Sequence, residues 1–447
     1  MSETNDHDEQ LTQDAVGLLK KLIRNACVND GTPNSGQEVR NANTLEEFFA
    51  GSGAIVRRFE SHPGRVSIAF TVEGCDPDAE PLTLMGHTDV VPVDRPKWSM
   101  DPFAAEEING RIYGRGATDM LYITAAMAAV TRDVARGSTA PRGTLTFVGL
   151  ADEEARGGLG AGWIAENDPE AFNWKNCLSE EGGSHLPVQD GSDALIVVVG
   201  EKGAAQRRLV VHGDAGHGST PYGRDLAVAR IAEVARRVAA IDPPVRSDEL
   251  WEGYVKAFRF DPDTEKQLLG GEGYENLGGL ARYSHAMSHL TIAPTVLRAG
   301  AAINVFPSTA YLELDIRPLP GHTQDEIDEM LREALGELAG EVEIQHLITE
   351  DATVSPTFGP LYDALLATFQ EFFPGTPVVP TIAAGGSDLR FARAKGGVGY
   401  GFALHSKEQT LGSVLNQLHS HDEYVELADV DLTTRAYRSL VRRFLGA

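Results

Sequence analysis

Acidic side chains follow several apolar runs in this chain, and one case is extreme. The largely apolar run 144–150 is followed at once by Asp152, Glu153 and Glu154 in the stretch TLTFVGLADEEARGG. Adjacent carboxylates repel one another, so a buried cluster of this kind needs either protonation or a cation to be tolerated. A solvated turn is the ordinary interpretation of such a stretch, and a metal site is the chemical one.

Histidines and further acids occupy comparable places elsewhere in the sequence. Imidazole and carboxylate ligands together suit zinc and similar divalent ions. Two zinc ions would be neutralised by three carboxylates and one bound hydroxide, which is one way for a cleft to tolerate clustered acids. The candidates are His87 and Asp89 in LTLMGHTDVVPV, Asp119 in GRIYGRGATDM, Glu180 and Glu181 in NCLSEEGG, and His419 and His421 in LHSHDEYV.

Taken singly, each segment is weak evidence, because acidic runs are usually solvated turns and lone histidines are usually structural. The glycine-rich stretch RGGLGAG could also indicate a dinucleotide-binding loop. However, three acids stand between the preceding strand and these glycines, where a pyrophosphate needs bare backbone N–H groups. The sequence therefore argues against a nucleotide-binding oxidoreductase.

The segments that carry these residues alternate between strand and helix patterns. This alternation predicts an α/β domain with a mainly parallel sheet. In such sheets, ligands bind beyond the carboxyl ends of the strands, where three of the motifs are expected to lie. The expected helices cover 11–27, a segment from Thr44 with Glu47 as a capping box, 119–136 and 159–166, and the expected strands cover 54–59, 66–72, 82–86 and 144–150.

The pattern changes after about residue 203 and changes back near residue 350. Between them, we expect strands at 206–211, 302–305, 310–317 and 342–347 and helices at 224–241 and 324–338. That order predicts an α+β two-layer sandwich, while the Gly-rich segment 262–290 stays unassigned. The α/β pattern then resumes and ends with a helix at 429–445. We therefore expect a discontinuous catalytic domain, 1–203 with 350–447, and an inserted domain, 204–349.

Composition limits the classes of partner. The 447 residues include 65 acids and 39 Lys or Arg, a net charge of −26, which argues against nucleic-acid binding. No stretch approaches the roughly 20 apolar residues of a membrane span, and the polar start MSETNDHDEQ does not resemble a signal peptide. Three widely spaced cysteines indicate neither a disulfide framework nor a thiolate zinc site. We expect a cytoplasmic protein without membrane contacts.

Together, the motifs resemble the co-catalytic di-zinc amidohydrolases, which include aminoacylase, acetylornithine deacetylase, succinyl-diaminopimelate desuccinylase, glutamate carboxypeptidase and carnosine-type dipeptidases. The resemblance spans nearly the whole chain and rests, in family order, on GHTDVVPV, WSMDPFAAEEINGRIYGRGATDM, DEE, EEGG, AGHGSTP, AAINVFPS and HSHDE. It implies hydrolysis of an amide bond in an N-acyl amino acid or a short peptide. A dipeptidase or carboxypeptidase is the alternative to a deacylase, and a non-catalytic relative that binds metal or a small ligand is less favoured.

The resemblance also implies a ligand set for two divalent ions, Zn²⁺ first and Co²⁺ or Mn²⁺ as alternatives. His87 and Glu181 would bind one ion, Glu154 and His419 the other, and Asp119 would bridge them. Within two pairs the choice stays open, since Glu180 could replace Glu181 and His421 could replace His419.

Catalytic and substrate roles follow by the same resemblance. Glu153 would be the general base for the attacking water, and Asp89 would accept the second ring N–H of His87. His217 of the inserted domain would stabilise the oxyanion, often in the site of a partner subunit. The inserted domain would accordingly act as a lid and form a homodimer.

Three further residues are candidates for binding the substrate. Asn304, in the INVFP motif, is a candidate for contacting the substrate. Arg390 could bind a substrate carboxylate with two hydrogen bonds, assisted by Ser387. The chain departs from the family where Leu121 and Tyr122 follow Met120, since a lysine and a glycine are usual there. Asp152 receives no role from the resemblance.

Overall fold

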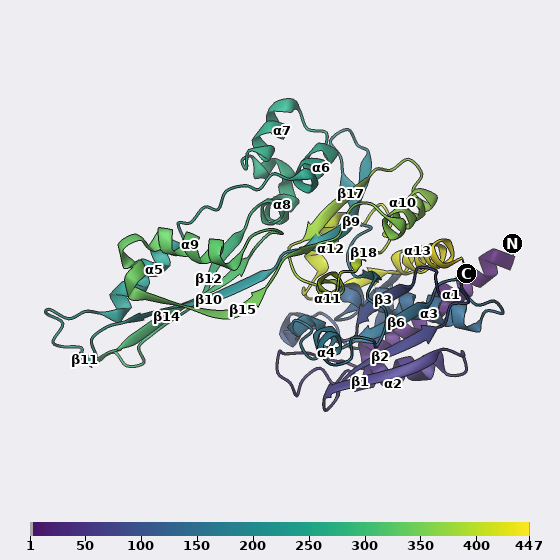
Figure 1. The fold of residues 1–447 in the computed structure, drawn as a ribbon, viewed down its shortest axis with the longest axis horizontal. Coiled ribbons are helices and arrows are strands. Elements are labelled where there is room, and N and C mark those ends of the chain that lie inside the picture. Colours follow the sequence, from purple (N-terminus) through teal and green to yellow (C-terminus); the bar gives the residue numbers. More distant parts are fainter. Residues whose placement is uncertain (1–2, 447) are drawn as a thin grey trace.

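A ten-stranded sheet forms the centre of the larger part of the molecule (Figure 1). The computed structural model describes residues 3–446. Strands β6, β3, β7 and β18 run parallel at the centre of the sheet, and most pairings toward its two edges are antiparallel. The strands are β1 (Ile55–His62), β2 (Arg65–Val72), β3 (Leu82–His87), β6 (Leu145–Leu150), β7 (Asn176–Ser179), β8 (His185–Pro187), β9 (Asp193–Glu201), β16 (Thr353–Val354), β17 (Val378–Ala383) and β18 (Val398–Gly401).

Helices cover both faces of this sheet. In β6, Leu145 and Phe147 pack into one apolar core and Val148 and Leu150 into another, so the strand is buried on both sides. The first core is shared with α1 (Glu3–Arg24), α2 (Val39–Phe49), α3 (Tyr122–Arg136), α10 (Pro360–Phe372) and α13 (Leu427–Leu445), and the second with α4 (Ala161–Asn167) and α11 (Leu389–Ala394). The predicted fold class is confirmed: an α/β domain with a mainly parallel central sheet and a separate α+β two-layer sandwich.

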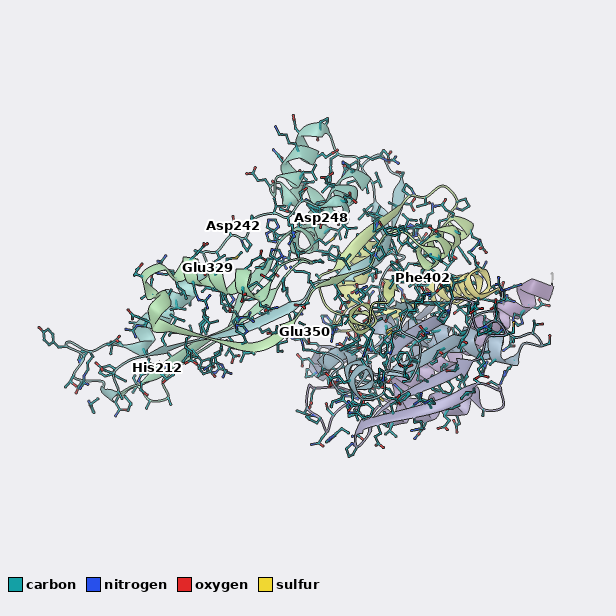
Figure 2. The ribbon with its side chains drawn as sticks, in the orientation of Figure 1. His212, Asp242, Asp248, Glu329, Glu350 and Phe402 are labelled. Atoms are coloured by element: carbon teal, nitrogen blue, oxygen red, sulfur yellow. The ribbon has the colours of Figure 1, made fainter. Side chains whose placement is uncertain are left out.

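A second, antiparallel sheet extends away from the first (Figure 1). Two helices, α5 (Ala227–Val238) and α9 (Gln324–Leu335), share its apolar core, which makes a two-layer unit. Glu350 lies where this sheet meets the larger part, and His212 lies toward its far end (Figure 2). The strand order is β12 (Thr291–Ala299), β14 (Thr309–Arg317), β10 (Ala204–His212) and β15 (Val342–Glu350), with a two-stranded ribbon of β11 (Gly216–His217) and β13 (Val305–Phe306) at the far end.

The segment 262–290, left unassigned in the sequence, is largely helical, and together with the helix that precedes it this segment belongs to a different layer. Helices α6 (Glu249–Ala257), α7 (Pro262–Leu269) and α8 (Ala281–Ser288) pack against β9 and β17 of the large sheet. Trp251 and Tyr254 of α6 are fully buried there. Part of the range 204–349 therefore shares a core with the catalytic sheet rather than with the four-stranded sheet.

Two expected elements were placed wrongly. The helix expected from Thr44 begins at Val39, and its N-cap residue, the buried Glu38, makes no side-chain capping hydrogen bond, so no capping box starts this helix. The strand expected at 302–305 is not in the four-stranded sheet, where β12 takes its place. Pro294 lies at a register shift of β12, an edge strand, which is where a sheet tolerates proline.

The remaining elements are short. A three-stranded sheet of β4 (Glu106–Ile108), β5 (Arg111–Tyr113) and β19 (Tyr424–Glu426) brings the C-terminal motif beside the turn that carries Asp119. Across residues 3–446, every helix is too short or too polar for a transmembrane segment. The other short elements are α12 (Leu411–Gln417), 3₁₀ helices at Arg95–Lys97, Glu153–Ala155, Tyr274–Leu280 and Gly336–Glu341, and a π-helical turn at Ala117–Leu121.

Candidate metal centre

Three loops meet at the carboxyl edge of the parallel strands. Strand β3 ends at His87, and its neighbours β6 and β7 end at Leu150 and Ser179. Because these strands are parallel neighbours, the segments that follow them lie side by side. Those segments supply Asp89, Glu153, Glu154 and Glu180.

The His87 imidazole lies between carboxylates. Its Nε2 atom is 3.2 Å from Asp119 Oδ1 and 3.4 Å from Glu180 Oε2. Its Nδ1 atom is 2.9 Å from the backbone carbonyl oxygen of Asp89 and 3.7 Å from that residue's carboxylate. A proton on Nδ1 that donates to this carbonyl leaves the Nε2 lone pair for a metal ion. The ring is therefore oriented by the backbone of Asp89 and not, as we expected, by its side chain.

The Asp89 carboxylate instead holds the acidic loop. It accepts hydrogen bonds from the backbone N–H groups of Glu153 and Glu154, both at 3.2 Å, and from Asn29 Nδ2 at 2.8 Å. These bonds fix the direction in which both glutamates leave the strand. Asp89 thus connects the His87 loop to the loop that carries the expected general base.

Asp119 lies between the two histidines. Its Oδ1 atom faces His87, and its Oδ2 atom is 3.2 Å from Nε2 of His419. The same Nε2 is 3.2 Å from Glu154 Oε2. Within the described chain, Glu154 Oε1 is buried without a hydrogen-bond partner, which suits a position facing a cation. This donor set fits two adjacent divalent ions that share Asp119.

Glu180, rather than Glu181, is the acid beside His87. One oxygen of Glu180, one of Glu153 and one nitrogen of His87 lie within 4.8 Å of one another. Glu181 has a left-handed backbone (φ 67°) and lines the same pocket, but among the described residues it does not belong to this group. The sequence favoured Glu181, and the geometry favours the alternative. Both candidate histidines are exposed, and His419 is the one whose ring contacts Asp119 and Glu154.

Burial makes these acids hold protons when no cation is present. Loss of hydration raises the pKa of Glu180 and of Glu181 to about 8, and it raises the pKa of Glu153 well above its usual range. Hydrogen bonds to Asp119 and Glu154 raise the pKa of His419 to about 10. A bound divalent ion would replace these protons.

This electrostatics predicts a pH-dependent stability for the metal-free protein. Glutamates of ordinary pKa release their protons near pH 4.5 when the chain is unfolded, whereas Glu180 and Glu181 keep theirs to about pH 8 in the fold. The metal-free protein should therefore lose stability as the pH rises from about 4.5 to about 8. Calorimetry should show the difference in Tm between zinc-loaded and chelator-treated protein widening from pH 5 to pH 8. A constant or narrowing difference would contradict this expectation.

A buried glutamate that we did not single out holds the Asp119 turn. Glu423 Oε2 is 2.6 Å from Arg115 Nη1, and its carboxylate accepts the backbone N–H groups of Thr118 at 2.8 Å and Asp119 at 3.2 Å. The peptide bond between Asp119 and Met120 is cis. The signal in the sequence was the DE pair that ends HSHDE, since Glu423 connects the C-terminal motif to the bridging aspartate.

Asp152, to which the sequence assigned no role, connects the acidic loop to Arg65 and to the backbone of Leu159. Its Oδ1 atom is 2.6 Å from Arg65 Nη2, and its Oδ2 atom accepts the backbone N–H of Leu159 at 2.7 Å. Arg65 also forms an ion pair with Glu38, and all three charged side chains are buried. The first acid of the run is therefore a structural anchor, which frees the next two for the site.

A pocket of about 400 Å³ adjoins the cluster and is lined in part by Glu153, Glu154, Glu180 and Arg390. Arg390 donates to the backbone carbonyls of Ser387 and Arg156, and its Nε atom is 4.0 Å from Glu350. Ser387 does not fit its expected part in binding the substrate. Its hydroxyl donates to the buried Glu201 at 2.6 Å, so it stabilises the loop.

His217 and Asn304 lie together, but far from the cluster in the same chain. Both are exposed, and the Gly218 N–H donates to the carbonyl oxygen of Asn304 at 2.7 Å. They belong to the ribbon of β11 and β13, at the opposite end of the molecule from β3 and β6 (Figure 1). Neither residue lines the pocket described above. Within one chain, the structure does not bring these two residues to the other candidates.

An α/β sheet with imidazoles and carboxylates gathered at its carboxyl edge defines a metallohydrolase. The chain belongs to the peptidase family M20/M25/M40, whose model matches residues 83–443. This family is dependent on a dinuclear metal centre, and the protein is accordingly a metal-dependent amidohydrolase.

Individual relatives cover the whole chain at low identity. The succinyl-diaminopimelate desuccinylase of Rhodospirillum centenum is 26% identical over 444 residues, 98% of this chain and 99% of the relative. The N-fatty-acyl-amino acid synthase/hydrolase PM20D1 of Xenopus tropicalis is 25% identical over 98% of this chain and 88% of its own. The structure of an M20 family metallo-carboxypeptidase from Sulfolobus solfataricus superposes over 100% of both chains, with a TM-score of 0.71 and 17% identity.

Proposed function

We propose that the protein hydrolyses the amide bond of an N-acyl amino acid or short peptide at two divalent ions, most simply Zn²⁺. His87 and Glu180 would hold one ion, Glu154 and His419 would hold the other, and Asp119 would be shared by both. The observation that carries the proposal is that the two oxygens of Asp119 face two different imidazoles, each also beside a glutamate. A structural aspartate has no need of that arrangement.

Glu153 is the general base in this proposal. When bound, the ions polarise the scissile carbonyl and acidify the attacking water. Glu153 takes the proton from that water and gives it to the leaving nitrogen. Burial raises the pKa of its carboxyl well above the usual range, and the bond from its backbone N–H to Asp89 holds it at the edge of the cluster. A carboxylate whose pKa is raised toward neutral pH binds the proton of the water more readily and can then donate it to the leaving nitrogen.

Arg390 is the proposed partner of a substrate carboxylate. It is nine-tenths buried, lines the pocket and donates hydrogen bonds to two backbone carbonyls, and its Nε atom is 4.0 Å from Glu350. The names of the two relatives, a desuccinylase and an N-fatty-acyl-amino acid hydrolase, both describe acylated amino acids and so support a deacylase. A dipeptidase or carboxypeptidase remains the second candidate, favoured by the fold of the metallo-carboxypeptidase.

A hydrolysis screen tests the proposal. Purified protein, first stripped by a chelator and then reloaded with Zn²⁺, Co²⁺ or Mn²⁺, is offered N-acetyl amino acids, N-succinyl amino acids and dipeptides. We expect amide cleavage only after reloading, and the preferred panel separates deacylase from dipeptidase. Reloaded protein that holds two ions per chain and cleaves none of the amides would contradict the proposal and favour a non-catalytic binding protein. The cytoplasmic location expected from the sequence stays a prediction.

We also propose that the protein acts as a homodimer in which His217 of one subunit completes the site of the other. Its exposed position at the far end of the inserted domain suits that role better than a role within its own chain. His217→Ala should then lower kcat by about 100-fold, the usual loss for an oxyanion donor. A mixed dimer of a His217→Ala subunit and a Glu153→Ala subunit should recover about half of the wild-type activity, because one of its two sites is complete.

Co-expression with two different affinity tags isolates the mixed dimer, and doubly tagged Glu153→Ala dimers serve as the inactive control. Light scattering measures the assembly state of the wild-type protein. A monomer under all conditions, or mixed dimers without activity, would show that His217 does not act in the partner's site. Neither result would affect the metal ligands.

A further inference from the structure

One wall of the pocket is apolar, and it begins directly beside the metal cluster. Helix α12 (Leu411–Gln417) and the residue after it present Leu411, Val414, Leu415 and Leu418 to the pocket. These positions recur at the spacing of one helix face. Leu418 directly precedes the proposed ligand His419, so the apolar face runs up to the metal centre.

Two of these side chains belong to no apolar core of the described chain. Leu411 and Leu415 pack with Tyr283 and the helices α6 to α8, whereas Val414 and Leu418 are half-buried and contribute to none of the core clusters. Ile196 and Val198 of β9 continue the same surface inside the pocket. Helices α6 to α8 thus support an apolar wall whose exposed part faces the reaction site.

Most basic side chains that line the pocket already have acceptors within the protein. This pairing limits how many substrate carboxylates the pocket can bind. Arg156 donates to Glu350 with two nitrogens, at 3.0 and 2.8 Å, and Arg317 pairs with Asp315 at 2.8 Å. Lys202 Nζ donates to Thr291 and to two backbone carbonyls. Among the basic residues that line the pocket in the described chain, only Arg390 has neither a hydrogen-bonded carboxylate nor a full set of acceptors, and its Nε atom lies 4.0 Å from Glu350, beyond hydrogen-bond distance.

We infer that the site selects amides that carry one carboxylate, held by Arg390, and one large aliphatic group, held against the wall formed by Val414, Leu418, Ile196 and Val198. This inference rests on the proposed function and narrows its substrate class. A second carboxylate, as in an N-succinyl amino acid, would meet no available cation. An aliphatic group would instead displace water from an apolar surface, which is favourable for every added methylene.

Two substrate series test the inference and separate the two sources of an aliphatic group. In the first, the acyl chain of one N-acyl amino acid is lengthened from acetyl to hexanoyl and compared with succinyl. In the second, an acetyl group is kept and the amino-acid side chain changes from alanine to leucine. We expect kcat/KM to rise by at least about tenfold along one of the two series, and to be lowest for succinyl. The series that responds shows which side of the amide faces the wall.

A matched pair of variants assigns the effect to the wall. Val414→Asp places a charge on the apolar face, and it should reduce the preference for the longer aliphatic group by about tenfold. Asn416→Asp adds the same charge to the exposed face of the same helix and should leave that preference unchanged. Metal content is measured in both, so that a damaged centre is not mistaken for altered specificity.

The possible results distinguish a wrong substrate preference from a wrong proposed function. Hydrolysis of acetyl or succinyl substrates with equal or greater efficiency than all larger aliphatic ones would overturn the inference and leave the proposed function intact. An unchanged preference in Val414→Asp would also overturn it. A metal-loaded protein that cleaves no amide in either series would contradict the proposed function itself.

Discussion

Glu153→Gln should lower kcat by about 10³-fold while the protein still holds two metal ions per chain. A positioned general base typically contributes 10²–10⁴-fold, and glutamine keeps the size of the side chain but cannot accept the water's proton. The bond from the residue's backbone N–H to Asp89 does not depend on the side chain, so the acidic loop should keep its course. Steady-state kinetics on the best amide of the screen, with metal analysis of the same preparation, measures both quantities.

The metal analysis decides between two roles for this residue. Glu153 lies with His87 and Glu180 in a group that could itself bind an ion. If Glu153 were a ligand, Glu153→Gln would lose an ion together with activity. Full metal occupancy with residual activity near wild type would contradict both roles. Glu181→Gln is a matched control, because it makes the same substitution at another buried glutamate of the pocket.

Most of the metal cluster could be predicted because the ends of buried strands can be recognised in a sequence. An apolar run followed at once by acids marks the carboxyl end of a buried strand, and parallel neighbours bring such ends together. This reasoning groups His87 with Glu154, whereas Asp119 follows a glycine-rich turn and enters the predicted site only through the family resemblance. Their mutual distances agree with this placement, although the ligand roles themselves stay proposals.

Other features depend on contacts between segments that are far apart in the sequence. A local sequence pattern cannot predict such contacts. Ser387 was expected to assist substrate binding, but its hydroxyl donates to Glu201 at the end of β9, which is far from Ser387 in the sequence. Asp152 had no role until Arg65 of β2 was found beside it. Strand β12 was not predicted, and its Pro294 lies at a register shift of an edge strand, where a sheet tolerates proline.

The choice between Glu180 and Glu181 shows the limit of local reasoning most clearly. Two adjacent glutamates after a strand are equivalent in composition, and alternation cannot order them once the strand has ended. The left-handed backbone of Glu181 breaks that symmetry, and Glu180 lies 3.4 Å from His87. The two residues therefore make different predictions for the same conservative substitution.

Glu180→Gln should weaken binding of one of the two ions by more than about 100-fold and lower kcat accordingly. Loss of a group that merely supports a ligand already costs 10–100-fold in metal affinity, and a direct ligand should cost more. Glu181→Gln should keep both ions, since that side chain is buried nearby but is not the one beside His87. Titration of chelator-treated protein with Zn²⁺, followed by calorimetry, compares the two variants directly.

The reverse result is equally informative. If Glu181→Gln lost an ion and Glu180→Gln did not, metal binding would have to reorganise the loop after β7, because His87 now faces Glu180. A loss in both variants would indicate that the ions depend on the shared negative charge of the loop rather than on one ligand. Only a loss confined to Glu180→Gln agrees with the arrangement in which His87 and Glu180 hold one ion and Asp119 connects it to the other.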